Sequence, residues 1–79
     1  MVHINVEKVR VARGITKTHV AKKIGKSLQG YRHMASGSVK IGAEELMVIA
    51  DTLAVDIRIF FDSKLTESVI KKISETKTA

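Results

Sequence analysis

The stretch THVAKKIGKSLQGYRHMASG, residues 18–37, decides the fold. It holds two short segments in which apolar residues recur at helical spacing, separated by only a few residues around Gly25. Glycine adopts a positive φ without strain, so the chain can turn sharply at Gly25. Ala21 is small enough for the second segment to cross close above the first. We therefore predict helices over 17–24 and 28–35, joined by a tight corner.

Caps, glycines and apolar spacing place the other helices, because the chain contains no proline. The predicted segments with their capping residues are 6–13 with Asn5, 17–24 with Thr16, 28–35 with Ser27, 43–54, a short turn at 57–61 with Asp56, and 67–75 with Thr66, where Leu65 and Ile70 form a hydrophobic staple. The residues expected to end the first three helices are Gly14, Gly25 and Gly37. No segment alternates convincingly as a strand does, so the predicted fold class is all-α.

The composition excludes several classes of protein. The 79 residues suffice for one small domain, and the absence of cysteine excludes disulfides and thiolate zinc sites. His3, His19 and His33 lack the i, i+4 spacing and the acidic neighbours of a metal site, and no nucleophile–base group or glycine-rich phosphate loop occurs. We expect no metal, no cofactor and no enzymatic activity. Without a signal peptide or an apolar run of about 18 residues, we expect a cytoplasmic protein with no membrane partner.

Positive charge is concentrated in the first half of the chain. Residues 1–41 hold nine Lys or Arg residues and one acid, Glu7, whereas residues 42–79 hold five Lys or Arg residues and seven acids. The net charges of the two parts are +8 and −2, which together give the +6 of the whole chain. A basic part joined to a nearly neutral part suggests one face for a polyanion and another for packing or a partner. Lysines that merely keep the surface soluble are the alternative explanation.

The corner at Gly25, its two flanking caps and the basic surface together specify a helix-turn-helix, whose second helix projects into a DNA major groove. The sequence here resembles the Cro/repressor-type helix-turn-helix family, also called the xenobiotic-response-element family. The segments that carry the resemblance, within residues 5–62, are VEKVRVARGITKTHVAKKIGKSLQGYRHMASG and EELMVIADTLAVDIRIFF. The resemblance implies a five-helix repressor-like DNA-binding domain over 1–62, usually dimeric on its operator, with an additional C-terminal helix and tail over 63–79.

Three positions depart from the pattern of that family. Many members carry an acidic residue near the end of the recognition helix that pairs with an arginine of the first helix; here Arg10 is present, but the matching position is Ala35. Without that partner, Arg10 is expected to be exposed or to reach the DNA backbone. Lys26 replaces a commonly apolar residue after the turn glycine. Gly30 lies inside the recognition helix, where it costs about 0.5–1 kcal/mol relative to alanine.

Helical geometry divides residues 28–35 into an inner side, with Tyr31 and Met34, and an outer side. The residues expected to contact bases are Leu28, Gln29, Arg32 and His33; glutamine suits adenine, arginine suits guanine, and leucine suits the thymine methyl group. The residues expected to contact phosphates are Arg10, Thr16, Lys17, Lys26, Ser27 and Lys40. The alternative role of Thr16 and Ser27 is helix capping alone, and the alternative for the outer side is a plain solvated surface.

The second half of the chain is expected to serve assembly, since one recognition helix reads only a few base pairs. The predicted dimerisation residues are Ile57, Ile59, Phe60, Leu65, Val69, Ile70 and Ile73. The apolar stripe of the last helix can instead fold back onto its own core. Phe60 and Phe61 are interpreted as core residues rather than as a platform for base stacking.

Two functions remain open. The preferred hypothesis is a sequence-specific regulator of transcription that binds double-stranded DNA as a homodimer, a repressor of phage, plasmid or bacterial type. The alternative is an antitoxin or accessory module whose main partner is a protein bound at the C-terminal helix. Binding of an operator-like duplex by the isolated chain, with a steep dependence on salt, distinguishes the first from the second.

Overall fold

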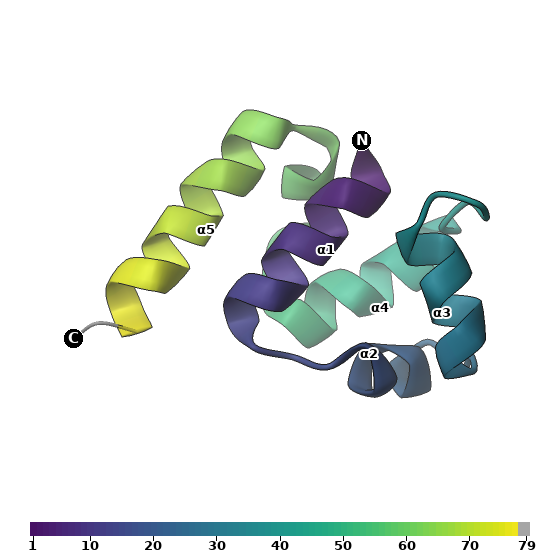
Figure 1. Cartoon of the computed structure of the whole chain (residues 1–79). Coiled ribbons are helices and arrows are strands. Elements are labelled where there is room, and N and C mark those ends of the chain that lie inside the picture. The colour runs from purple at the N-terminus through teal and green to yellow at the C-terminus, as the bar shows by residue number, and fades with distance from the viewer. Residues whose placement is uncertain (78–79) are drawn as a thin grey trace.

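The computed structural model describes residues 1–77 and contains five α-helices and one 3-10 turn, with no strand among these residues (Figure 1). The elements are α1 (Val2–Arg13), α2 (Lys17–Lys23), α3 (Leu28–Ala35), α4 (Ala43–Leu53), the 3-10 turn η1 (Ile57–Phe61) and α5 (Ser63–Lys77). The predicted all-α class is therefore confirmed. Residues 78 and 79, at the end of the predicted tail, lie outside the described residues.

Glycines turn the chain at the ends of the first three helices, as predicted. Their φ values are 72° at Gly14, 71° at Gly25 and 86° at Gly37. At the corner after α2, the Lys26 N–H donates to the Ala21 carbonyl at 2.9 Å, and the Gly25 N–H donates to the Lys22 carbonyl at 3.2 Å. These two bonds satisfy the last carbonyls of α2 while the left-handed glycine redirects the chain into α3.

Three of the predicted helix caps are confirmed. Backbone N–H groups at the starts of α2, α3 and η1 donate to Thr16 Oγ1 at 3.1 Å, to Ser27 Oγ at 3.0 Å and to Asp56 Oδ1 at 2.9 Å. At α5 the cap is Asp62, whose Oδ1 accepts the N–H groups of Lys64 at 2.9 Å and Leu65 at 3.2 Å. The staple predicted from Leu65 is wrong, because Leu65 itself lies inside the helix.

Asn5 and Thr66 are not helix caps, which corrects two predictions. Helix α1 begins at Val2 and helix α5 begins at Ser63, three residues before Asn5 and Thr66 respectively, so both side chains lie within a helix. Both are buried, and both donate to carbonyls of η1: Asn5 Nδ2 to that of Phe60 at 2.9 Å, and the Thr66 hydroxyl to that of Ile59. The Ile59 carbonyl also accepts the N–H of Asp62 at 3.2 Å. The bonds from Asn5 and Thr66 therefore attach η1 to α1 on one side and to α5 on the other.

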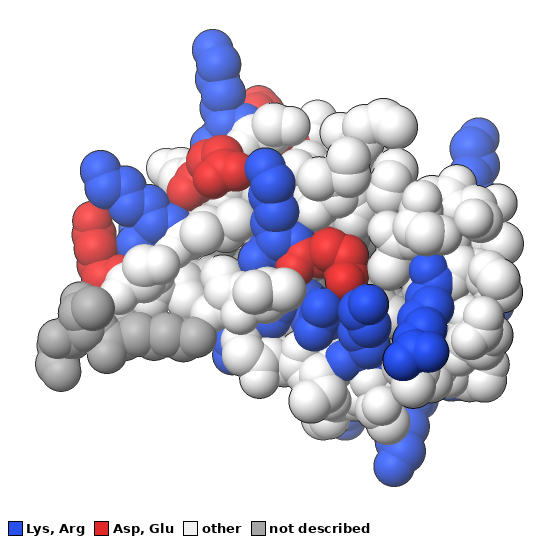
Figure 2. All heavy atoms as spheres, viewed as in Figure 1, with Lys and Arg blue, Asp and Glu red and all other residues white. Residues whose placement is uncertain are grey.

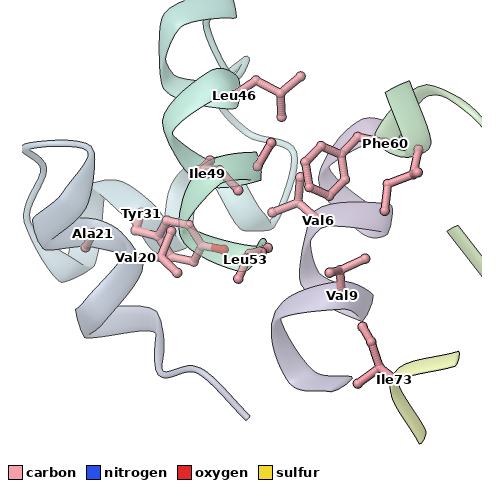
Figure 3. Packing of buried hydrophobic residues seen from close by; sticks show 12 residues of the cluster. Val6, Val9, Val20, Ala21, Tyr31, Leu46, Ile49, Leu53, Phe60 and Ile73 are labelled. Atoms are coloured by element: carbon pink, nitrogen blue, oxygen red, sulfur yellow. The ribbon is translucent and has the colours of Figure 1, made fainter. Parts of the chain in front are cut away.

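The core joins all six elements (Figure 3). Its buried apolar side chains are Val6, Val9, Val20, Ala21, Tyr31, Leu46, Ile49, Ala50, Leu53, Ile59, Phe60 and Ile73. Figure 3 shows Tyr31 of α3 beside Val20 of α2 and Leu53 of α4, with its hydroxyl end pointing toward α1. The pair α2–α3 is thus attached by its inner sides, which leaves the outer side of α3 facing solvent.

The last helix, α5, lies beside α1 (Figure 1). Ile73 is only 5% exposed and belongs to the core, while Val69 and Ile70 pack against it. At the surface, Lys8 Nζ of α1 lies 2.8 Å from Glu67 Oε1 of α5. The apolar stripe of α5 therefore folds back on the protein's own core, the alternative that the sequence left open.

Replacing Gly25 tests the corner between α2 and α3. A Cβ at this position would meet nothing within 4 Å, so a side chain placed here destabilises the fold only through the backbone strain of the positive φ. We expect Gly25→Ala to lower the free energy of unfolding by about 1–2 kcal/mol, and Gly25→Asn to lower it less, because asparagine tolerates the left-handed conformation. Urea unfolding followed by circular dichroism measures both changes. Equal stability of wild type and Gly25→Ala would contradict a strained corner.

Candidate nucleic-acid interface

The outer side of α3 is polar and open to solvent. Gln29, Arg32 and His33 are exposed, while Tyr31 and Met34, each 1% exposed, hold the opposite side in the core. Gln29 Nε2 lies 3.4 Å from His33 Nε2, one helical turn further on. The Arg32 side chain has no hydrogen bond or ion pair within the described part of the chain. These three side chains are therefore available to any partner that approaches α3 from outside.

Two residues at the margins of this surface differ from the sequence reading. Leu28 is half-buried, because its position on the helix lies between the inner Tyr31 and the outer Arg32. Ser36 is exposed at the end of α3 and was not predicted as a site residue; its hydroxyl donates to the His33 carbonyl at 3.0 Å. The signal for Ser36 is its spacing, since positions 29, 33 and 36 share one helical face.

Thr16 and Ser27 serve as caps and remain exposed. In each case the hydroxyl oxygen accepts a backbone N–H from the helix that follows. A hydroxyl that accepts one bond still has a proton to donate. Capping and a phosphate contact are therefore compatible at both residues.

Lys26 is tied to α4. Its Nζ lies 3.2 Å from Glu45 Oε2, and Glu45 Oε1 accepts the Gly42 N–H at 2.9 Å. The bond from Gly42, reinforced by the bond and the charge of Lys26, lowers the pKa of Glu45. Glu45 is therefore ionised at neutral pH and offsets part of the positive charge that Lys26 brings to this surface.

Positive charge surrounds the outer side of α3. No acidic residue occurs between Glu7 and Glu44, and this interval includes all of α2 and α3. Figure 2 shows Lys and Arg side chains without acidic neighbours over the outer edge formed by α3, whereas acidic and basic side chains alternate over α5. Lys17, at the start of α2, is half-buried, and Lys40, beyond α3, is exposed. The surface around α3 is therefore suited to a polyanion.

Arg10 is bound inside the protein, which corrects the expectation that it is exposed or reaches a phosphate. Its side chain is 13% exposed, and its Nε and Nη2 donate to Glu7 at 2.9 and 3.0 Å. Its Nη1 donates to the Ile15 carbonyl at 2.7 Å. The Tyr31 hydroxyl donates to the same Glu7 carboxylate at 2.6 Å. Glu7, three residues before Arg10 on the same helix, thus supplies the acidic partner that Ala35 does not.

The protonation states in this network support one another. Burial opposes ionisation of Glu7, but the hydrogen bonds from Arg10 and Tyr31 and the charge of Arg10 outweigh it and lower the pKa of Glu7. Burial and the bond to Glu7 raise the pKa of Tyr31, so its hydroxyl keeps its proton. The bond to Glu7 raises the pKa of Arg10. At neutral pH the ionised carboxylate of Glu7 therefore accepts hydrogen bonds from Arg10 on α1 and from Tyr31 on α3, both of which keep their protons.

Most of the predicted dimerisation residues are inside the monomer, which corrects that set. Ile59, Phe60 and Ile73 are buried, and Ile57, Val69 and Ile70 pack against the core. Leu65 alone of the seven is exposed, at 48%. Phe61, interpreted as core, is 66% exposed instead and lines a surface hollow with Val2, Val39 and Ile41.

No three His, Cys, Asp or Glu side chains among residues 1–77 gather closely enough to hold a metal ion. Within the same range, no helix has both the length and the apolar character needed to cross a bilayer.

Comparison with known proteins gives one match. A family model described as Helix-turn-helix, of the Cro/C1 or xenobiotic-response-element type, matches residues 6–60. This range begins in α1, ends in η1 and contains the whole α2–α3 corner. No curated protein and no solved structure matches the chain.

Substituting Glu7 tests the network through its dependence on pH. Because the pKa of Glu7 is lowered on folding, its stabilising effect is complete above the ordinary value of 4.5 and is lost as the pH falls through the lowered value. We expect Glu7→Gln to lower the free energy of unfolding by about 1–3 kcal/mol at neutral pH, since Arg10 and Tyr31 lose a charged acceptor. Urea unfolding across the acidic range should show this difference shrinking. A difference that stays constant with pH would contradict the proposed ionisation of Glu7.

Proposed function

The chain belongs to the Cro/C1-type helix-turn-helix family and is therefore a non-catalytic DNA-binding protein; we propose that it is a sequence-specific transcriptional repressor of phage, plasmid or bacterial type. In this role α3 enters the major groove of an operator, and a homodimer binds two half-sites. Such a repressor acts in the cytoplasm, where the operator lies, and prevents transcription by occupying the promoter.

The observation that supports this proposal is the outer side of α3, where exposed polar side chains belong to a stretch of chain, between Glu7 and Glu44, that contains no acidic residue. The amide of Gln29 has one donor and one acceptor, which match the acceptor and donor that adenine presents in the major groove. The guanidinium of Arg32 has paired donors, which match the two acceptors of guanine. His33, and Ser36 one turn beyond, lie on the same side and extend the contact along the groove. Leu28, being half-buried, has a smaller reach toward a thymine methyl group.

Phosphate contacts flank this reading surface. Lys17 at the start of α2 and Lys40 beyond the end of α3 supply the charge, and the Thr16 and Ser27 hydroxyls supply directional donors. Lys26 contributes less, because Glu45 competes for it. Arg10 does not take part, since its guanidinium is occupied by Glu7 and Ile15.

The surface for homodimerisation is proposed at the hollow that contains Phe61. This side chain and Val39 are 66% and 50% exposed and line the same hollow, and exposed apolar side chains that gather at one place mark interaction sites. Gly37 and Lys40, in the connection that follows α3, line the same hollow. In a two-fold dimer the same residues line the interface in both copies, so the C-terminal ends of both α3 helices would lie near this interface.

A groove beside α5 supports the second candidate, an accessory or antitoxin-like module with a protein partner. Ile4 and Val11, 45% and 64% exposed on α1, line this groove together with Ile70 of α5. A partner helix laid there would contact the C-terminal helix. DNA binding that appears only with a co-expressed partner would favour this second candidate over the first.

Selection of bound sequences from random duplex DNA tests the reading surface. We expect wild type to enrich one motif, and Gln29→Ala and Arg32→Ala each to weaken binding to it by about 1–3 kcal/mol and to relax the choice of base at one position. Arg58→Ala is the matched control, because Arg58 is an exposed arginine on η1. Retention of the same motif and affinity in both α3 variants would remove α3 as the reader.

Charging the hollow tests the dimer. We expect Phe61→Lys to shift the protein toward monomer and to weaken operator binding, because a buried lysine cannot replace the apolar contact. Analytical ultracentrifugation, with and without operator, measures the association. Val11→Lys, which places the same charge in the α1–α5 groove, serves as the control. A wild type that stays monomeric on DNA, or a Val11→Lys variant that alone dissociates, would contradict this choice of surface.

A further inference from the structure

We propose that Glu7, which lies on α1 and outside the reading surface, is a positioning residue for the recognition of DNA sequence. Its carboxylate fixes the rotation of α3 through the Tyr31 hydroxyl, so that base discrimination depends on Glu7 more than overall attraction to DNA does. This inference rests on the proposed function, because it assigns a residue that makes the α3 surface selective.

The Glu7 carboxylate joins α1 to α3 directly, and through Arg10 it is connected to the segment that leads into α2. Glu7 accepts the Tyr31 hydroxyl of α3 at 2.6 Å and two N–H groups of Arg10 at 2.9 and 3.0 Å. Arg10 also donates to the carbonyl of Ile15, in the connection that leads into α2. Glu7 therefore links α1, the entry to α2 and the middle of α3. Bonds between charged groups of this kind are short and directional.

Tyr31 lies on the buried side of α3, where a bond to another helix can fix the rotation of α3 about its axis. It lies between Gln29 and Arg32 in the chain but on the opposite side of the helix, 1% exposed. The polar side chains on the outer side bond locally: Gln29 lies near His33, and Ser36 donates to the His33 carbonyl. These local bonds turn with the helix and cannot fix its rotation, whereas the bond from Tyr31 reaches another helix.

Small rotations of α3 affect base recognition because hydrogen bonds to base edges require a narrow range of distances and angles. A side-chain atom about 6 Å from a helix axis moves by about 1 Å when the helix rotates by about 10°. A hydrogen bond to a base edge tolerates only a few tenths of an ångström around 2.9 Å. Phosphate contacts by flexible lysines absorb such a shift, since they depend on charge rather than on a fixed direction. Loss of the Glu7–Tyr31 bond should therefore reduce selectivity first.

The test compares affinities for two duplexes, the motif enriched by wild type and a scrambled sequence of the same length and composition. We expect Glu7→Gln and Tyr31→Phe each to reduce the ratio of the two affinities by about tenfold, while affinity for the scrambled duplex changes by less than about twofold in either direction. Tyr31→Phe removes a single oxygen and keeps the ring in the core, so it isolates the hydroxyl if Glu7→Gln is poorly folded. Far-UV circular dichroism at the assay temperature confirms that each variant is folded.

Glu67→Gln is the matched control. Glu67 also pairs with a basic residue of α1, through Lys8 at 2.8 Å, and its loss changes the net charge by the same amount, but within the described residues it forms no hydrogen bond or ion pair with α3. It should raise both affinities equally and leave their ratio unchanged. The double variant Glu7→Gln with Tyr31→Phe should be no less selective than Glu7→Gln alone, because both changes act on the same Glu7–Tyr31 bond: one replaces its charged acceptor by a neutral amide and the other removes its donor.

The outcomes separate this inference from the proposed function. If wild type enriches no motif, the proposed function fails and the role of Glu7 falls with it. If wild type discriminates but folded Glu7→Gln and Tyr31→Phe discriminate equally well, only the positioning role is wrong. A ratio that falls as far in Glu67→Gln would also overturn it, since charge alone would then explain the loss.

Discussion

The hydrogen bond between Tyr31 and Glu7 is the contact on which the arrangement of the DNA-binding motif depends. A tyrosine in the core requires a partner for its hydroxyl, and here the partner is a carboxylate that Arg10 already holds in place. The bond connects the middle of α3 to α1, the helix that also packs against α5 and η1. The outer side of α3 is consequently supported from within by the whole domain, although it faces solvent itself.

The same contact explains how the protein keeps a positive surface without losing internal order. Acidic residues are absent from the interval between Glu7 and Glu44, so any structural carboxylate for α2 and α3 must come from outside that interval. Glu7 and Glu45, just beyond its two ends, fill this role: one binds Arg10 and Tyr31, and the other binds Lys26. Each of these carboxylates is paired with a basic side chain, which offsets its repulsion of phosphates.

The sequence predicted the helices and the corner because these depend on local rules. Glycines with positive φ and the caps Thr16, Ser27 and Asp56 act within a few residues, and the structure has them where the pattern placed them. Asn5 and Thr66 have the same chemistry as caps, but their partners are carbonyls of η1, which lie 55 and seven residues away in the chain. No local pattern distinguishes the two uses of such a side chain.

The residues of the candidate site could likewise be predicted only where their positions follow from local helical spacing. Helical spacing identified the outer residues of α3, and could have included Ser36. The sequence did not predict the partner of Arg10, because the family pattern places an acidic residue at position 35. In this chain the acidic partner is Glu7, three residues before Arg10 on α1. Which of Phe60 and Phe61 is buried, and whether α5 covers its own core, depends on how η1 is held between two helices. Such tertiary constraints leave no periodic signal.

The most direct test of the central claim is an NMR titration of isotopically labelled protein with the duplex it selects. If α3 is held by α1 and reads the groove, the largest changes in amide shifts should fall on residues 28–36 and on the start of α2, while α5 stays nearly unchanged. Changes confined to α5 and the α1–α5 groove, with α3 unaffected, would contradict the claim.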